Sequence, residues 1–359
     1  MRKHSILPFF IPHLGCPHQC VFCNQRSITG FREPIAVKEI EERIERFVNE
    51  DTNSSVSKEV AYYGGSFTAM PEAIQKQLLE PAARAMRENK IKRIRISTRP
   101  DYIRSDALNL LKKYNVTLVE LGIQSLDERV LKGSGRGHGR GVSLAAIDLL
   151  KKNGFEVGAQ LMIGLPFDSY SKSIETAREI VKRRPDYVRI YPALVIKGTV
   201  LEKMYYNNEY SPMSLGDSIN LCKQMAILFR DARIKLIRIG LHPDQELLKP
   251  GLICAGPFHP AYGELVKSSM ALDLLLSVIK QVENKEQGSM RIEVPFSDAS
   301  IFIGQKKSNV KYLSSLLPEL NIKIVGSPFH NMIKIIMHKR ELIAHYSDGF
   351  REKKMVEEK

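Results

Sequence analysis

Residues 16–23 read Cys-Pro-His-Gln-Cys-Val-Phe-Cys, and an apolar segment at 6–12 precedes them. This stretch places Cys16, Cys20 and Cys23 at spacings of four and three. Thiolates gathered this closely are typical of a Zn²⁺ site or of an iron–sulfur cluster. A zinc site would need a fourth ligand, for which His18 is a candidate, whereas a cluster on three cysteines would leave one iron open for chemistry. The other two cysteines are isolated, so the five do not resemble a disulfide framework.

The first two thirds of the chain alternate between apolar, β-branched runs and amphipathic segments. Strands are expected at 6–12, 59–63, 91–96, 117–121, 156–163, 187–191 and 234–239. Helices are expected at 37–48, 71–88, 105–114, 142–153, 171–183 and 214–231. This alternation favours right-handed βαβ units and therefore an α/β fold with a mainly parallel sheet.

Cysteines, glycines and polar residues of the kinds that form active and binding sites directly follow five of the expected strands. They lie at 16–23, 64–66, 97–101, 122–125 and 164–166. Ligands collect at the carboxyl ends of parallel strands in both open sheets and barrels. Five turns that converge on one site favour a partial parallel (β/α) barrel over an open sheet.

The rest of the chain has a different character. We predict the barrel domain at 1–240. It is followed at 241–288 by a Pro-, Gly- and His-rich loop and a helix, which either cover the barrel or link it to the next unit. A small C-terminal α+β unit is expected at 289–345. The charged tail at 346–359 is expected to be frayed.

The chain is strongly basic. Its 359 residues include 54 Lys and Arg against 40 Asp and Glu, a net charge of +14. Such an excess favours a polyanionic partner such as RNA, although a merely basic surface gives the same charge. No apolar run is long enough to span a bilayer, and no export signal is indicated. Together with the cysteine usage, these features predict a cytoplasmic protein with no membrane partner.

The cysteine segment, followed by glycine-rich turns in matching order, resembles the radical S-adenosylmethionine superfamily. The resemblance implies a [4Fe–4S] cluster on Cys16, Cys20 and Cys23, with the amino and carboxylate groups of S-adenosylmethionine on the fourth iron. It implies reductive cleavage of that cosubstrate to a 5′-deoxyadenosyl radical. An external electron donor, flavodoxin or ferredoxin, would then be required.

The same resemblance assigns residues to the methionine half of the cosubstrate. Phe22 is the aromatic residue that members carry just before the third cysteine. Gly64, Gly65 and Ser66 match the glycine-rich turn whose backbone lies against the methionine amino group, an approach that a Cβ would obstruct. Arg136 resembles an arginine that holds the methionine carboxylate.

Other residues are assigned to the nucleoside half. Gln124, in the segment Gly122-Ile123-Gln124-Ser125, resembles a glutamine that contacts the nucleoside. Gln160 stands where members carry a polar residue near the ribose. Ile163 and Leu165 belong to a segment that resembles the one packed on adenine.

Within the superfamily, the segments 97–102, 136–138 and 191–199 resemble the radical domain of the Elongator catalytic subunit family, which modifies wobble uridine in tRNA. The coproporphyrinogen-oxidase-like branch is the next nearest resemblance. No acetyltransferase domain is found after Leu241, so the Elongator reaction as a whole is not carried over.

Several basic residues are candidates for RNA contact. Arg99 and Arg104 end a basic run at 84–104, and Lys132 and Arg140 flank a glycine-rich loop. In the C-terminal unit, the residues around Lys306 and Lys307 resemble the loop with which KH modules clamp a nucleic-acid backbone, although the usual second glycine is missing. A helix-capping turn or a solvated helix end explains the same residues.

Cys254, His259 and Tyr262 lie in the loop after the predicted barrel, where each has either a substrate-specific or a structural role. Cys254 is a candidate hydrogen donor to a radical or a packed thiol. We therefore predict a radical S-adenosylmethionine enzyme that modifies RNA, either tRNA or rRNA. The alternatives are a radical enzyme acting on a small, tetrapyrrole-like molecule and a non-catalytic, metal-stabilised RNA-binding protein.

Overall fold

The computed structural model describes residues 4–25, 27, 35–50, 56–243, 245–282, 288–337, 340–347 and 349–358. The chain forms two compact units. The first unit comprises 1–218 and 231–258, and the second comprises 219–230 and 259–359. The predicted boundary at residue 240 therefore falls inside the first unit, because 241–258 stays with the barrel.

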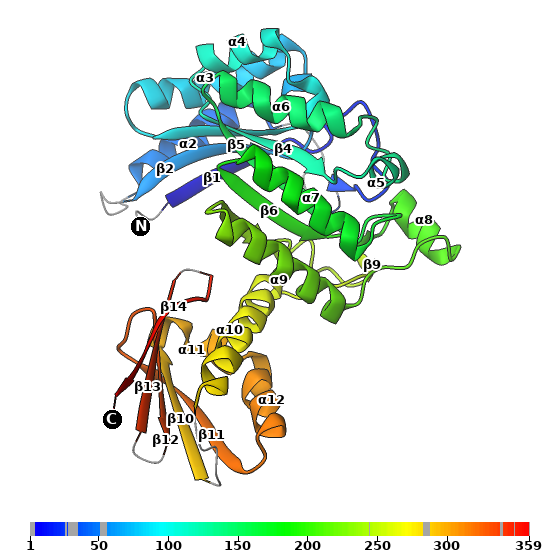
Figure 1. The fold of residues 1–359 in the computed structure, drawn as a ribbon. Helices are drawn as coiled ribbons and strands as arrows, with labels where there is room; N and C mark the ends of the chain where they lie inside the picture. Colours follow the sequence, from blue (N-terminus) through cyan, green and yellow to red (C-terminus); the bar gives the residue numbers. More distant parts are fainter. Residues whose placement is uncertain are drawn as a thin grey trace. The chain divides into compact units, whose positions relative to one another are not determined.

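A seven-stranded sheet is the centre of the first unit (Figure 1). Its strands are all parallel and run in the order β1-β2-β3-β4-β5-β6-β8. They are β1 (His4–Phe10), β2 (Ser57–Tyr63), β3 (Arg93–Thr98), β4 (Leu118–Gln124), β5 (Glu156–Ile163), β6 (Tyr187–Pro192) and β8 (Lys235–Ile239). Because neighbouring strands are joined through helices, the sheet curves into the predicted partial barrel.

Helices connect the strands. They are α2 (Val37–Asn49), α3 (Glu72–Arg87), α4 (Ser105–Lys113), α5 (Glu128–Gly133), α6 (Arg140–Lys152), α7 (Tyr170–Arg183), α8 (Val200–Tyr206) and α9 (Leu215–Asp231). Figure 1 shows α2, α3, α4 and α6 together along one side of the sheet. A short antiparallel pair, β7 (Val195–Ile196) and β9 (Ile253–Ala255), follows β6.

The two faces of the sheet differ in chemistry. On one face, alternate residues are apolar and fully buried, such as Val60, Ile94 and Val119. On the other face, the residues between them include Glu59 and Glu120, which are also buried. The apolar face packs as a hydrophobic core, and the polar face must satisfy its charges internally.

The second unit is an α+β structure, as predicted. Its sheet has the order β11-β10-β12-β13-β14, with β10 and β11 parallel and the other neighbours antiparallel. The elements are α10 (Tyr262–Lys280), β10 (Gly288–Pro295), α11 (Ala299–Ile303), α12 (Ser308–Leu316), β11 (Leu320–Ser327), β12 (Met332–Met337), β13 (Arg340–Ser347) and β14 (Arg351–Glu358). The helices pack their buried apolar residues with those of β10, β11 and β12.

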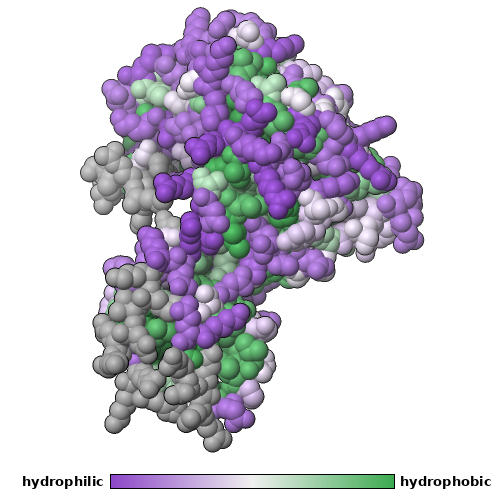
Figure 2. Space-filling model, in the orientation of Figure 1, coloured by the Kyte–Doolittle hydropathy of each residue, from purple (hydrophilic) through white to green (hydrophobic). Residues whose placement is uncertain are grey.

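The expectation of a frayed tail was wrong. Residues Arg351–Glu358 form β14, which pairs antiparallel with β13. The backbone hydrogen bonds to β13 hold this segment despite its charge. On the face shown in Figure 2, hydrophilic residues predominate and hydrophobic ones reach the surface in smaller areas. Within the described residues, no helix has the length and apolar character that a membrane span requires.

Candidate active site

The cysteine loop follows β1 and is fixed by hydrogen bonds at both ends. The His13 N–H donates to Gln25 Oε1 at 2.6 Å, and the Gln25 N–H donates to His13 Nε2 at 3.0 Å. In the middle, the Val21 N–H donates to the Ser134 carbonyl at 3.1 Å. These bonds hold the loop against the segment that follows α5.

The three loop thiols influence one another. Burial, followed by the neighbouring Cys20, raises the pKa of Cys16. Burial, followed by Cys20 and Cys16, raises the pKa of Cys23 to about 12. Metal ligation requires thiolates, so binding of a metal here must release protons. Among the described residues, no three His, Cys, Asp or Glu side chains form a ready-made metal centre.

The turn at Gly64-Gly65-Ser66 contacts this loop directly. Gly65 has a φ of +59°, and a Cβ there would lie 2.6 Å from the Ile11 carbonyl oxygen and still closer to that of Leu14. The Ser66 N–H donates to the Leu14 carbonyl at 2.8 Å, and its buried hydroxyl lies 3.1 Å from Thr98 Oγ1. Only a glycine allows the two backbones to approach this closely.

Gln124 ends β4 with a φ of +69°, after a bulge that begins at Gly122. Its side chain is 5% exposed, and its buried Oε1 has no hydrogen-bond partner among the described residues. Left-handed backbone outside glycine is uncommon and is enriched at functional sites.

Arg136 brings a positive charge to the cysteine loop. Its Nη1 donates to Cys20 Sγ at 3.1 Å, and its Nη2 donates to the Gly122 carbonyl. Its Nε is buried and has no partner in the part of the chain that the structure describes. The guanidinium thus lies in direct contact with one of the three loop thiols.

His138 lies next to Arg136, with its Nε2 3.3 Å from Arg136 Nη2. Burial, followed by the charge of Arg136, lowers the pKa of His138 to about 4. The imidazole is therefore neutral at neutral pH, and it adds no second positive charge beside the loop.

Arg99 contacts the loop that carries Arg136 and His138. Its guanidinium pairs with both carboxylate oxygens of Asp101, at 3.0 and 2.9 Å, and donates to the Arg136 carbonyl. It is only 4% exposed. Arg99 was predicted to contact RNA, and in the structure its guanidinium is buried against Asp101 and the loop that carries Arg136.

These groups fit an S-adenosylmethionine molecule on an iron–sulfur cluster. Buried polar atoms without partners are rare, because each costs about 1–3 kcal/mol. Among the described residues, Gln124 offers an unpaired acceptor, and Arg136, whose guanidinium contacts Cys20, offers an unpaired donor. The acceptor suits a hydroxyl or amine, and the donor suits a carboxylate.

The other residues predicted for the cosubstrate lie on β5 and in the adjoining apolar cluster. Gln160 is half-buried and pairs in register with Gly122. Ile163 and Leu165 are buried, and Phe22 packs against the cluster that contains Leu165. Phe22 thereby ties the cysteine loop to the carboxyl end of β5.

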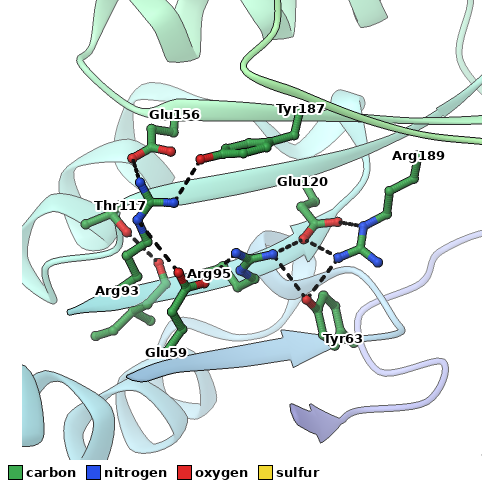
Figure 3. Close-up of polar contacts among 10 residues, drawn as sticks. Glu59, Tyr63, Arg93, Arg95, Thr117, Glu120, Glu156, Tyr187 and Arg189 are labelled. Atoms are coloured by element: carbon green, nitrogen blue, oxygen red, sulfur yellow. Dashed lines mark hydrogen bonds and ion pairs between the residues drawn. The ribbon is translucent and has the colours of Figure 1, made fainter. Parts of the chain in front are cut away.

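A charged network occupies the polar face of the sheet beneath the site, and sequence reasoning missed it (Figure 3). Arg95 pairs with Glu59 at 2.5 Å and with Glu120 at 3.2 Å. Arg189 pairs with Glu120 at 2.7 Å and donates to the Tyr63 hydroxyl at 3.1 Å. The signal was present as charged residues at alternate positions of otherwise apolar strands.

A second branch of the network lies toward the amino ends of the strands. Arg93 pairs with Glu156 at 2.8 Å and donates to the Tyr187 hydroxyl at 2.9 Å. With Glu59, Glu120 and Glu156 against Arg93, Arg95 and Arg189, the charges balance. The network forms a neutral, hydrogen-bonded floor and not a site with excess charge.

The remaining candidates are dispersed. Cys254 lies on β9, 3.5 Å from Glu202 Oε1, and packs with Phe22 in one apolar cluster. Burial, followed by Glu202, raises the pKa of its thiol. Tyr262 is buried in the second unit, where its hydroxyl lies 3.5 Å from Cys222 Sγ, and His259 Nδ1 accepts from the Ala261 N–H.

Five predicted RNA contacts, all except the buried Arg99, are at least partly exposed. Arg104 stacks over the Tyr102 ring and Arg140 pairs with Glu179 at 2.7 Å. Lys132 is exposed at the end of α5, and Lys306 and Lys307 are exposed between α11 and α12.

Two protein-family models match this chain. Residues 10–180 match the Radical SAM superfamily, and residues 185–271 match the Radical_SAM C-terminal domain. The chain belongs to the radical SAM superfamily. It is therefore an enzyme whose cofactors are a [4Fe–4S] cluster and S-adenosylmethionine, as predicted, and the zinc alternative is excluded.

The radical SAM protein has similar curated relatives, one of which is named for tRNA chemistry. The tRNA uridine(34) acetyltransferase of Methanocaldococcus infernus is 31% identical over 248 residues, which cover 57% of this chain and 46% of the relative. Elongator complex protein 3 of Homo sapiens is 29% identical over 262 residues, 60% of this chain and 48% of the relative. The match thus spans about half the length of each of these relatives.

A solved structure has the same fold. It is the archaeal Methanocaldococcus infernus Elp3 with an N-terminal deletion, which aligns with a TM-score of 0.62 at 22% identity. The alignment covers 99% of this chain and 78% of that one. The similarity confirms the predicted partial barrel.

Proposed function

We propose that this radical SAM enzyme reductively cleaves S-adenosylmethionine at a [4Fe–4S] cluster to a 5′-deoxyadenosyl radical. The radical would then be used to modify an RNA, with tRNA as the first candidate. The observation that carries the cleavage proposal is the unpaired Oε1 of Gln124 and the unpaired Nε of Arg136 beside Cys20. The names of the relatives and the net charge of +14 support RNA as the substrate class.

Each residue at the site then has a positioning role. Cys16, Cys20 and Cys23 would hold the cluster, and the backbone of Gly64 and Gly65 would lie against the methionine amino group. Arg136 would donate to the methionine carboxylate.

On the nucleoside side, Gln124 would accept from the nucleoside, and Gln160 would lie near the ribose. Ile163 and Leu165 would pack on the adenine. A one-electron donor such as flavodoxin or ferredoxin would supply the reductant.

The polar floor of the barrel adds preorganisation. Its charges are already paired, so that bringing a substrate to the site requires no rearrangement of Glu59, Glu120 or Arg189. The neutral His138 adds no positive charge of its own beside the Arg136 guanidinium, which would donate to the methionine carboxylate.

The test is anaerobic and uses the whole chain. The protein is reconstituted with iron and sulfide, reduced and given S-adenosylmethionine, and 5′-deoxyadenosine is quantified with and without total cellular RNA. We expect release that RNA stimulates and that Cys20→Ala abolishes. Cys222→Ala is the matched control, because it removes a buried thiol that lies outside the cysteine loop.

The outcomes separate the two parts of the proposal. Release that does not respond to RNA would retain the cleavage and would overturn RNA as the substrate class. No release from a protein whose visible absorbance shows an intact cluster would overturn the cleavage itself. Equal release from Cys20→Ala and the unmodified chain would contradict the assignment of the cluster ligands.

A further inference from the structure

The turn between α11 and α12 in the second unit has an unusual backbone. Gly304, Lys306 and Lys307 have φ values of +77°, +52° and +61°. A Cβ at Gly304 would lie 2.9 Å from the Asn309 nitrogen and closer still to Ser308 Oγ. Two consecutive lysines in the left-handed region are uncommon in any protein.

Asn309 fixes this turn from the inside. Its side chain is 4% exposed, and its Nδ2 lies 3.1 Å from the carbonyls of Ser268 and Phe302 and 3.0 Å from Ser268 Oγ. One buried amide thus joins the start of α12 to both α10 and α11. The two lysines that precede it are consequently presented on a fixed frame and not on a loose loop.

The surface around the turn is positively charged. Residues 299–318 contain Lys306, Lys307 and Lys311 and no Asp or Glu. All three lysines are exposed. Among the described residues, none of the three forms an ion pair, whereas many other exposed cations of this chain do, such as Lys76 with Glu72. Unneutralised lysines in a row suit the spaced phosphates of a nucleic-acid backbone.

An exposed aromatic side chain follows these lysines on α12. Tyr312 is 49% exposed on α12, one helical turn after Ser308, and Leu316 follows a turn later at 54% exposed. Figure 2 shows hydrophobic residues reaching the surface where Figure 1 draws α12. Exposed aromatic rings beside cations are the platform on which unpaired bases stack.

We propose that this surface, defined by Lys306, Lys307, Lys311 and Tyr312, binds a single-stranded segment of the RNA substrate. The lysines contact consecutive phosphates, and a base stacks on the Tyr312 ring. The inference rests on RNA as the substrate class, and it adds a second contact on a different unit from the cluster. A single strand fits better than a duplex because stacking requires an unpaired base.

The experiment measures binding by the full chain. A fluorescent single-stranded RNA of about 12 nucleotides is titrated at several salt concentrations, and its anisotropy gives the dissociation constant. For Lys306→Glu/Lys307→Glu we expect the dissociation constant to rise at least about tenfold. The slope of log affinity against log salt should fall by roughly 1.4, since each phosphate contact with a single strand contributes about 0.7. Tyr312→Ala should weaken binding about fivefold or more with an unchanged slope.

The matched control is Lys113→Glu/Lys152→Glu, which makes the same change in net charge at two exposed lysines of α4 and α6. It should shift the dissociation constant less than about twofold, because neither lysine belongs to the proposed surface. Unchanged melting temperatures would show that each variant is folded, as expected for exposed side chains outside the core.

The results distinguish this inference from the proposed function. If the unmodified chain binds RNA and the Lys306→Glu/Lys307→Glu variant binds as tightly as the control variant, the surface is wrong and RNA remains the substrate class. If the unmodified chain binds no RNA at any salt concentration, both are wrong. Displacement of the RNA by an equal concentration of a poly-glutamate peptide would assign the surface to an acidic protein instead.

Discussion

Gly65→Ala should disable the cysteine loop, and Gly154→Ala provides the control. Both glycines have a positive φ, +59° and +83°. They differ in surroundings, because a Cβ on Gly65 would lie 2.6 Å from a backbone oxygen whereas a Cβ on Gly154 would meet nothing within 4 Å. The pair separates the cost of a left-handed alanine from the cost of pushing the cysteine loop away.

The expected magnitudes follow from that difference. A left-handed alanine costs roughly 1–2 kcal/mol, which both variants share. Forcing a methyl group against backbone that cannot yield costs about 1–3 kcal/mol more, which applies to Gly65→Ala alone. In a unit of this size each kcal/mol lowers the melting temperature by about 2–4 °C. Gly65→Ala should therefore lower it about twice as far as Gly154→Ala.

The assay combines calorimetry with the iron and sulfide that each variant retains after reconstitution. Gly154→Ala should keep the full complement of iron, since its Cβ touches nothing. Gly65→Ala should lose most of it, because the displaced backbone of Ile11 and Leu14 leads directly into Cys16. Equal melting temperatures and equal iron contents in the two variants would refute the close approach of the two loops.

Three further predictions concern other parts of the structure. Glu120→Gln should lower the free energy of unfolding in urea by about 3 kcal/mol, because it leaves the buried Arg95 and Arg189 without their shared anion. The control Glu80→Gln removes an exposed pair with Arg87 and should cost below about 1 kcal/mol. Similar losses would argue against the network. Because the pKa of His138 is lowered in the folded chain, the unfolded chain takes up a proton on this imidazole at a higher pH than the folded chain does. Stability should therefore fall as the pH drops from about 6.5 towards 4. In His138→Asn, the unfolding midpoint should decline less over the same pH range. An identical pH dependence in both proteins would contradict the burial of the imidazole. Asn309→Ala should destabilise the second unit by about 2 kcal/mol, against little change for the exposed Asn321→Ala, with hydrogen exchange of α12 as the readout. Unchanged protection of α12 would show that Asn309 does not fix the turn.

The fold was predictable because its pattern is periodic. Parallel strands buried on at least one face read as apolar, β-branched runs, and each was followed by a helical pattern. The cysteine segment and the glycine turn were recognisable for the same local reason, since three thiols and two adjacent glycines are readable without any knowledge of tertiary structure.

The interior charges were not predictable, because their partners lie on different strands. Arg95 reads as part of a basic run in the sequence, yet the sheet places it between Glu59 and Glu120. Arg99 was a candidate for RNA contact because it lies in the same basic run, and only the fold reveals that it is buried against Asp101 and the Arg136 carbonyl. The strand at Arg351–Glu358 was missed because its hydrogen bonds come from β13 and its sequence does not alternate apolar and polar residues.

The division of the chain at α9 has a consequence for how the protein is made. Residues 219–230 belong to the second unit, whereas 231–258 return to the first. Lys223 of that helix pairs with Asp273 at 2.8 Å, and Arg230 donates to the Gly349 carbonyl at 2.8 Å. On the ribosome, the segment 219–230 therefore emerges well before most of the residues it packs with, and the first unit is incomplete until residue 258 has been synthesised. Expression of the second unit by itself would need to begin upstream of residue 219 and would carry 231–258 as a foreign loop.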